Sequence, residues 1–137
     1  MIARTLVALA ILALPAAVSG ESVDFSRMLV GTWSGDIQLH SAENPSRTLV
    51  VEAVDAANGT FRGKYAAGGK RLRPVHGWVE RVGSFVVVRF TSPQRGRAEL
   101  RLQEDGVLMG EYHLREGSSV GRTVGRPMRL QRAEPPR

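Results

Sequence analysis

The sequence predicts an all-β protein, a single eight-stranded antiparallel barrel with up-and-down topology. Three observations predict this class. Apolar and polar residues alternate with a period of two in most segments after residue 29, turn-forming residues separate these segments, and no helical segment lies among them. Eight short strands of this kind can close into a barrel whose interior is filled by side chains or holds one small ligand. A two-sheet sandwich is the main alternative.

Residues 1–20 have the plan of a secretory signal peptide. One positive charge, Arg4, precedes an apolar run over residues 6–14, and Pro15 and small residues follow up to Gly20. The apolar run is shorter than the roughly 20 residues that span a bilayer, and no later segment qualifies. We therefore expect an exported protein, periplasmic or secreted, with no transmembrane span in the mature chain.

The composition narrows the partners of this protein. The full chain of 137 residues leaves one domain after the leader and contains no cysteine, so the exported domain depends on its hydrophobic core rather than on disulfides. A formal net charge of +6 either attracts anionic partners or only keeps the surface of the protein well solvated. Export argues against nucleic acid as a partner.

The barrel domain is expected over residues 29–132, between a lead-in at residues 21–28 and a disordered tail at residues 133–137. A glycine and a tryptophan, Gly31 and Trp33, open its first strand, which runs to Leu39 with alternate residues buried. The second strand, residues 48–54, follows a loop with a proline and is expected to place three residues on one face: Leu49, Val51 and Ala53. A turn at Asn58 and Gly59 leads to the third strand, residues 60–66.

For the fourth strand, residues 71–81, the sequence leaves two alternatives for which set of alternate residues faces inward. Either its valines at 75 and 79 or its larger residues, Leu72, His76 and Trp78, face inward. Pro74 predicts a strand end or a bulge, because proline cannot donate a ladder hydrogen bond. The fifth strand, residues 85–91, contains three consecutive valines, which indicate burial on both faces.

The last three strands are expected over residues 97–103, 107–115 and 122–131. Two hairpins in the chain end alike, since residues 59–65 and 106–112 each place a large, a small and a large residue on the inner face after a turn. Glycine at the middle position lets a strand bend around a small barrel. We interpret this as one local solution used twice, although two hairpins can also resemble each other by chance.

Four short motifs resemble the avidin-like and lipocalin-like barrels known as calycins: Gly31-Thr32-Trp33, the glycine-rich segment ending at Tyr65, Val75-His76-Gly77 and Val124-Gly125. The resemblance covers nearly the whole mature chain and implies a calycin-like barrel. It also implies that Tyr65 stands where avidins bind the ureido oxygen of biotin, and that Phe90 and Tyr112 lie near ligand-facing tryptophans.

The sequence departs from avidins at most of the other biotin-contacting positions. Apolar residues or proline stand where that family has polar or tryptophan side chains: Gly35, Ile37, Leu39, Leu100 and Pro127. Buried ureido groups without hydrogen-bond partners are costly, so we expect the architecture without biotin binding.

The chain is also similar to small exported bacterial barrels that inhibit secreted proteases. Those barrels begin with the same glycine and tryptophan pattern and end on a strand like Leu130-Gln131-Arg132. They inhibit through an N-terminal segment, whose counterpart is residues 21–26, and they usually carry a disulfide that this chain lacks.

The polar residues give little sign of catalysis. The three histidines, His40, His76 and His113, are far apart in the sequence and at positions expected to face outward. The acidic pair Glu104 and Asp105 lies in a turn, where such residues are common. No nucleophile elbow or phosphate-binding glycine loop is present. We therefore expect no enzyme activity, no cofactor and no metal site.

Four inward aromatic residues are the candidate ligand-binding residues: Trp33, Tyr65, Phe90 and Tyr112. They either line a ligand site or simply fill the core. The sequence thus predicts an exported barrel that binds a small, largely apolar ligand in its mouth. The alternative is a protein-interaction module, such as an inhibitor of a secreted hydrolase or an envelope accessory factor. A basic run at residues 70–73, with Arg95 and Arg97, either contacts anions or is a solvated loop flank.

Overall fold

The computed structural model describes residues 26–39, 42–115 and 123–133. The expected leader at residues 1–20, most of the lead-in and of the tail, and His40 lie outside these residues. In the part of the chain that is described, no helix has both the length and the apolar character needed to cross a membrane.

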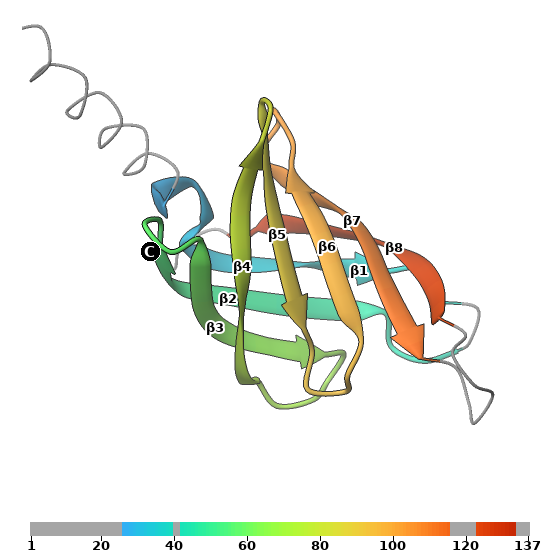
Figure 1. Cartoon of the computed structure of the whole chain (residues 1–137). Helices are drawn as coiled ribbons and strands as arrows, with labels where there is room; N and C mark the ends of the chain where they lie inside the picture. Colours follow the sequence, from blue (N-terminus) through green and yellow to red (C-terminus); the bar gives the residue numbers. More distant parts are fainter. Residues whose placement is uncertain (1–25, 40–41, 116–122, 134–137) are drawn as a thin grey trace, which may run out of the picture.

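The fold is a closed barrel of eight antiparallel strands in which every strand pairs with its neighbours in the chain and β8 pairs with β1 (Figure 1). The predicted fold class is therefore confirmed, and the two-sheet alternative is wrong. The strands are β1 (Gly31–Ile37), β2 (Ser46–Asp55), β3 (Thr60–Ala67), β4 (Arg73–Val82), β5 (Phe85–Thr91), β6 (Arg97–Leu102), β7 (Val107–Arg115) and β8 (Thr123–Arg132).

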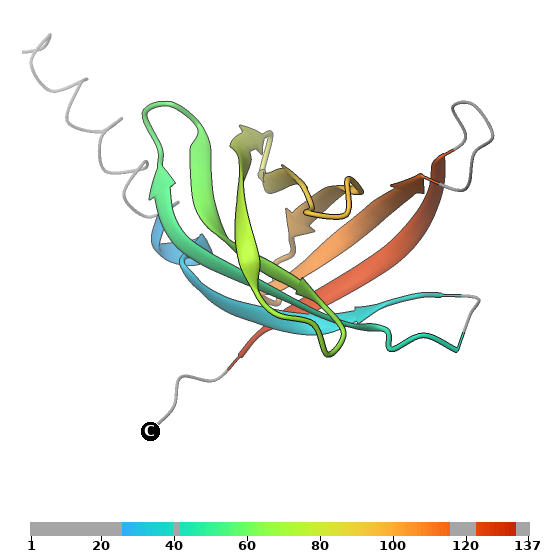
Figure 2. The same ribbon diagram turned by 90° about the horizontal axis from the view of Figure 1, so that it is seen from below.

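The up-and-down topology gives the barrel two unlike ends. The tight connections β2–β3, β4–β5 and β6–β7 share what we call the turn end, together with residues 26–30. The connections β1–β2, β3–β4, β5–β6 and β7–β8 share the opposite end, which we call the loop end. The ends of β1, β2, β7 and β8 on this side lie far from the helical turn of residues 26–29 (Figure 2).

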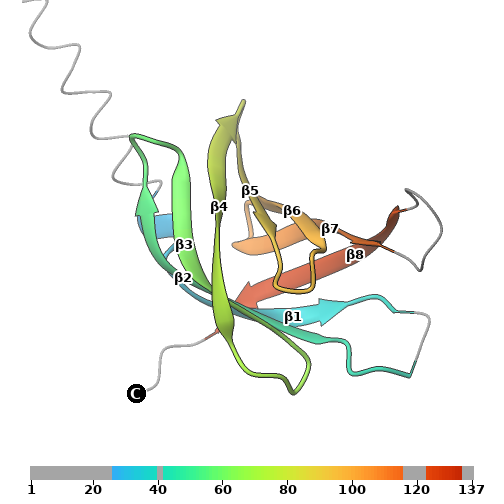
Figure 3. The ribbon, with the colours of Figure 1, turned by 60° about the horizontal axis from the view of Figure 1, so that its bottom comes forward.

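The turn end is covered by this short helical turn, which lies beside the start of β1 (Figure 3). Leu29 is fully buried, and its carbonyl accepts a hydrogen bond from the Trp33 indole at 2.9 Å. The guanidinium of Arg132 donates to the carbonyls of Met28 and Val30 and lies 4.6 Å from the centre of the Trp33 ring. Arg132 thus links the end of β8 to the segment that precedes β1.

The matching hairpins that the sequence suggested have the same plan in the structure. Gly59 and Gly106 both adopt positive φ, at 66° and 84°, as tight reversals require. In the strands that follow, Gly63 and Gly110 lie where an added Cβ would collide with the backbone carbonyls of Val50 and Glu99. These two glycines therefore permit a close approach of neighbouring strands.

In β4, the inward-facing residues are Val75, Gly77 and Val79, which answers the question that the sequence left open. Trp78 consequently points outward and is 56% exposed. The burial expected for the three valines of β5 is confirmed, since Val86, Val87 and Val88 are 7%, 4% and 1% exposed. Pro74 lies near the beginning of β4, where this strand pairs with β3 but not yet with β5. Proline has no backbone N–H, and at this position its absence does not interrupt the hydrogen bonds between β4 and β5.

Two expectations for the first two strands were wrong. β1 ends at Ile37 rather than at Leu39. The N–H of Ile37 donates to the carbonyl of Pro45, and because Pro45 has no N–H of its own, it cannot return a hydrogen bond that would extend the pairing of β1 with β2. In β2 the register shifts between Val51 and Ala53, which pair with Gly63 and Arg62 in turn. This bulge moves Ala53 off the inner face.

Candidate functional site

The structure buries all four aromatic residues proposed from the sequence, with exposed fractions of 1% for Trp33, 1% for Tyr65, 2% for Phe90 and 3% for Tyr112. It brings three of them together. The ring centres of Tyr65 and Phe90 are 5.3 Å apart, and Tyr65 stacks on Tyr112 at 6.2 Å. The contacts of Trp33 with Leu29 and Arg132 place it instead at the turn end.

Phe90 and Tyr112 belong to one row of paired residues across β4 to β7, and Tyr65 on β3 packs against both rings. In this row Phe90 pairs with Gly77 and Ala98, and Ala98 pairs with Tyr112. Small residues therefore alternate with large ones, which leaves room for both rings on the inner face. A Cβ at Gly77 would come within 2.9 Å of Phe90, so the glycine is part of the fit.

The β5–β6 connection is fastened to this cluster by a polar contact. The buried hydroxyl of Ser92 shares a hydrogen bond with the hydroxyl of Tyr112, and the N–H of Gly96 donates to Ser92 Oγ at 3.2 Å. Tyr112 thus has a satisfied hydroxyl and a structural role at the loop end.

Tyr65 is in the opposite situation. Its hydroxyl is buried and has no hydrogen-bond partner among the described residues. Burial raises the pKa of this hydroxyl, the neighbouring Tyr112 adds to the rise, and the neighbouring Arg47 opposes it. Both neighbours lie close enough to affect the pKa of the hydroxyl, but no contact with either meets the geometry of a hydrogen bond among the described residues. Buried polar groups in native proteins almost always have a partner, so this exception calls for an explanation.

Arg47 is the site residue that sequence reasoning missed. It faces inward near the start of β2 and is 8% exposed. One terminal nitrogen donates to the carbonyls of Asn44 and Ser46 at 3.0 and 2.8 Å, while its buried Nε has no hydrogen-bond partner in the described structure. The sequence contained a signal for its inward position, because Arg47 lies two residues before Leu49 and four before Val51 and therefore on the same face of the strand.

Apolar side chains surround this polar layer at the loop end. Leu39, which follows β1, and Leu114, in β7, are partly buried and pack against the core. We call the region of Leu39, Arg47, Tyr65, Tyr112 and Leu114 the mouth. It combines apolar side chains with two inward polar groups, Arg47 and Tyr65, which each have a buried atom without a hydrogen-bond partner among the described residues.

The basic run proposed from the sequence lies at the same end. A groove of about 580 Å³ separates the β3–β4 connection from Gln94 of the β5–β6 loop, and its lining includes Lys70, Arg71 and Arg73. All three cations are exposed. They give the rim of the mouth a positive charge.

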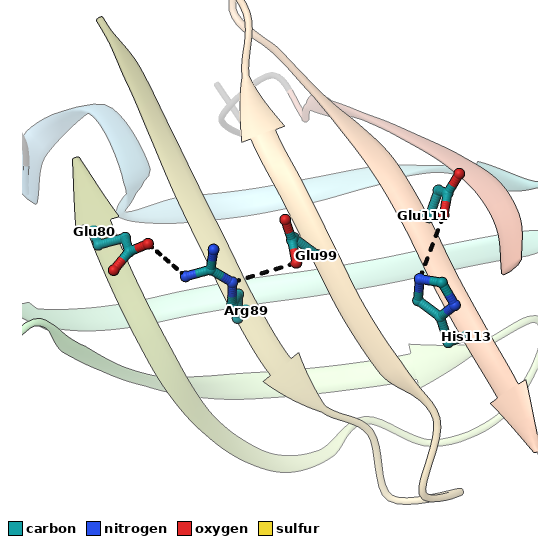
Figure 4. A network of polar contacts seen from close by, with 5 residues as sticks. All are labelled: Glu80, Arg89, Glu99, Glu111 and His113. Carbon is teal, nitrogen blue, oxygen red and sulfur yellow. Dashed lines mark hydrogen bonds and ion pairs between the residues drawn. The ribbon is translucent and has the colours of Figure 1, made fainter. Parts of the chain in front are cut away.

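The outer wall of the barrel carries a separate set of polar contacts (Figure 4). Arg89 on β5 bridges Glu80 on β4 and Glu99 on β6, at 2.7 and 3.3 Å, and both carboxylates raise the pKa of the guanidinium. Glu111 and His113 form a further pair at 3.3 Å on β7. Exposed pairs of this kind contribute about 0–1 kcal/mol each. The Arg89 pairs join neighbouring strands, whereas Glu111 and His113 lie on one strand.

Exposed Trp78 stands between two grooves on this wall, each of about 450 Å³. One is lined by Arg89, Arg97 and His113, and the other by Arg62 and His76. Within the described ranges, no three histidine, aspartate or glutamate side chains are grouped so that they could hold a metal ion.

The two tyrosines of the mouth predict opposite effects on stability. Tyr112→Phe should lower the free energy of unfolding by about 1–2 kcal/mol, because it takes a partner from buried Ser92. Tyr65→Phe removes a hydroxyl that has no partner among the residues described, so stability should be unchanged or rise by up to about 1 kcal/mol. Urea unfolding of both variants checks this, and an equal loss in the two would contradict the assignment of a free hydroxyl to Tyr65.

Comparisons with protein-family models, with curated proteins and with solved structures give no match to this chain. The case for function therefore depends on the geometry of the mouth.

Proposed function

We propose that this protein is exported by its N-terminal leader and binds a small, largely apolar ligand in the mouth of its barrel. One observation carries the proposal: Tyr65 buries a hydroxyl that has no hydrogen-bond partner among the described residues, beside the rings of Phe90 and Tyr112. An unpaired buried hydroxyl costs about 1–3 kcal/mol, and a ligand with one polar atom offsets that cost by accepting or donating a hydrogen bond.

The surroundings of this hydroxyl support an apolar ligand body. Leu39 and Leu114 are only partly buried and continue the core toward the loop end. Binding sites for small molecules are commonly apolar surfaces with a few placed polar groups. The architectural resemblance to avidin-like and lipocalin-like barrels also favours a ligand at one barrel end, without implying biotin.

The role of Trp33 in this proposal is indirect. Its position at the turn end makes it a support for the barrel rather than a contact of a ligand at the loop end. The proposed contacts are thus Tyr65 and Tyr112, with Phe90 behind them, which narrows the four residues predicted from the sequence.

A titration with 1-octanol, followed by two-dimensional NMR, tests the proposal. We expect saturable shifts at Leu39, Tyr65, Tyr112 and Leu114, and a weaker affinity after Leu114→Asp. Trp78→Ala, on the outer wall, should bind as the wild type does. If neither 1-octanol nor its carboxylate analogue octanoate binds at the mouth, the proposed function is wrong.

The alternative, a protein-interaction module, draws support from a different observation. Trp78 is an exposed tryptophan within a regular strand, flanked by two grooves with arginine and histidine side chains. Tryptophan and arginine are enriched at the energetic centres of protein interfaces. Loss of inhibition of a secreted protease after Trp78→Ala or after deletion of residues 21–27 would favour this alternative, and a lack of inhibition by the intact protein would exclude that inhibitor role.

A further inference from the structure

We infer that the mouth binds its ligand head first, with an anionic oxygen head such as a carboxylate against Arg47 and Tyr65, and an apolar tail leaving past Leu39 and Leu114. The inference rests on the proposed function and specifies the class of ligand. Its basis is a buried cation and a buried hydroxyl at one end of the barrel, the hydroxyl having no hydrogen-bond partner in the part of the chain that the structure describes.

Arg47 supplies the charge that such a head requires. Its guanidinium is largely buried, and among the residues that the structure describes it has no ion-pair partner. Within the described ranges, one of its terminal nitrogens has hydrogen bonds, both to neutral carbonyls. A buried cation without an anion is costly, so a carboxylate placed there gains both charge compensation and hydrogen bonds.

Tyr65 supplies a second donor on the neighbouring strand. Arg47 and Tyr65 both face inward, on β2 and β3, where Leu49 pairs with Tyr65 and Arg47 lies two residues before Leu49. Arg47 also opposes the rise in the pKa of the Tyr65 hydroxyl, as expected for a cation on the same inner face. A carboxylate has two oxygens, which match one guanidinium and one hydroxyl donor.

The charge of the rim and the chemistry of the walls complete the ligand class. Exposed Lys70, Arg71 and Arg73 at the loop end attract anions toward the mouth. Because Leu39 and Leu114 extend the apolar surface outward from the buried donors, an apolar tail adds affinity beyond that of a bare ion. The matching molecule is therefore an amphipathic monoanion such as a medium-chain carboxylate.

Calorimetric titrations of the mature chain with octanoate, 1-octanol and acetate test this inference. Octanoate should bind at least tenfold more tightly than 1-octanol, since hydrogen bonds to a charged group exceed those to a neutral one, and acetate should bind more weakly than octanoate. Equal affinity for octanoate and 1-octanol would overturn the anionic head while leaving the proposed function intact. Equal affinity for acetate and octanoate would overturn the apolar tail.

Two variants assign the head group to its residues. Arg47→Met should weaken octanoate binding about tenfold or more and leave 1-octanol binding within twofold. Tyr65→Phe should weaken octanoate binding about fivefold without any loss of stability, a combination that a purely structural role would not give. Arg81→Met, which removes an exposed charge of β4 near the turn end, is the matched control and should change neither affinity. Octanoate binding unaffected by both mouth variants would overturn the inference.

Discussion

Replacing Trp33 with alanine is expected to lower the free energy of unfolding by about 3–5 kcal/mol, the range typical of a buried large aromatic side chain. Trp33 is 1% exposed, and the substitution removes the indole that supports Leu29 and the contact surface of Arg132. Since small domains are stable by only about 5–15 kcal/mol, much of the barrel's stability depends on this side chain. Urea unfolding followed by circular dichroism measures the loss.

The second tryptophan provides the control for that experiment. Trp78 is 56% exposed on the outer wall, so Trp78→Ala should change stability by no more than about 0.5 kcal/mol. The chain has two tryptophans, so each variant also reports the fluorescence of the other one. Similar losses in both variants would mean that Trp33 does not support the turn end as the structure indicates.

Alanine in place of Gly63 or Gly110 is expected to destabilise the barrel by about 3 kcal/mol, at the upper part of the range for overpacking. The new Cβ at either position meets a backbone carbonyl of the paired strand, that of Val50 or Glu99. A flexible side chain can move aside, but a carbonyl in a closed ladder cannot without breaking the register. Thermal unfolding of the two variants measures the effect.

A glycine without such a neighbour separates this collision from backbone strain. Gly83 has a φ of 60° and no atom within 4 Å of an added Cβ. Gly83→Asn should therefore cost at most about 1 kcal/mol, because asparagine tolerates positive φ. If Gly63→Ala stabilised the protein, as alanine does in an open strand, the close approach of β2 and β3 would be refuted.

The barrel was predictable because its signals are local. The alternation of residues along each strand, and the glycines at 59 and 106, report directly on which face is buried and where the chain reverses. The parity of β4 was not predictable, since valine and tryptophan both suit an inner face. It depends on Gly77, whose contacts with Phe61 and Phe90 come from other strands.

The mouth was predictable only in part, for a related physical reason. Period-two alternation correctly gave the inward position of Tyr65, Phe90 and Tyr112, but it assumes that inward residues are apolar. Arg47 breaks that assumption and was not considered, although its parity was visible. The bulge in β2 and the end of β1 at Ile37 depend on pairing partners far along the chain, which one sequence does not display.

The pairing of β1 with β8 makes closure a late and collective event in folding. Arg132 reaches the carbonyl of Val30, 102 positions earlier, and Ala133 donates to Thr32 at 2.8 Å. Until the last strand is in place, β1 and β7 each present an open edge with unpaired backbone groups, which is a template for aggregation. Contacts at such long sequence separation also slow folding. A chaperone that shields these two edges until β8 has paired with both strands would therefore raise the yield of folded protein more than one that protects any single hairpin.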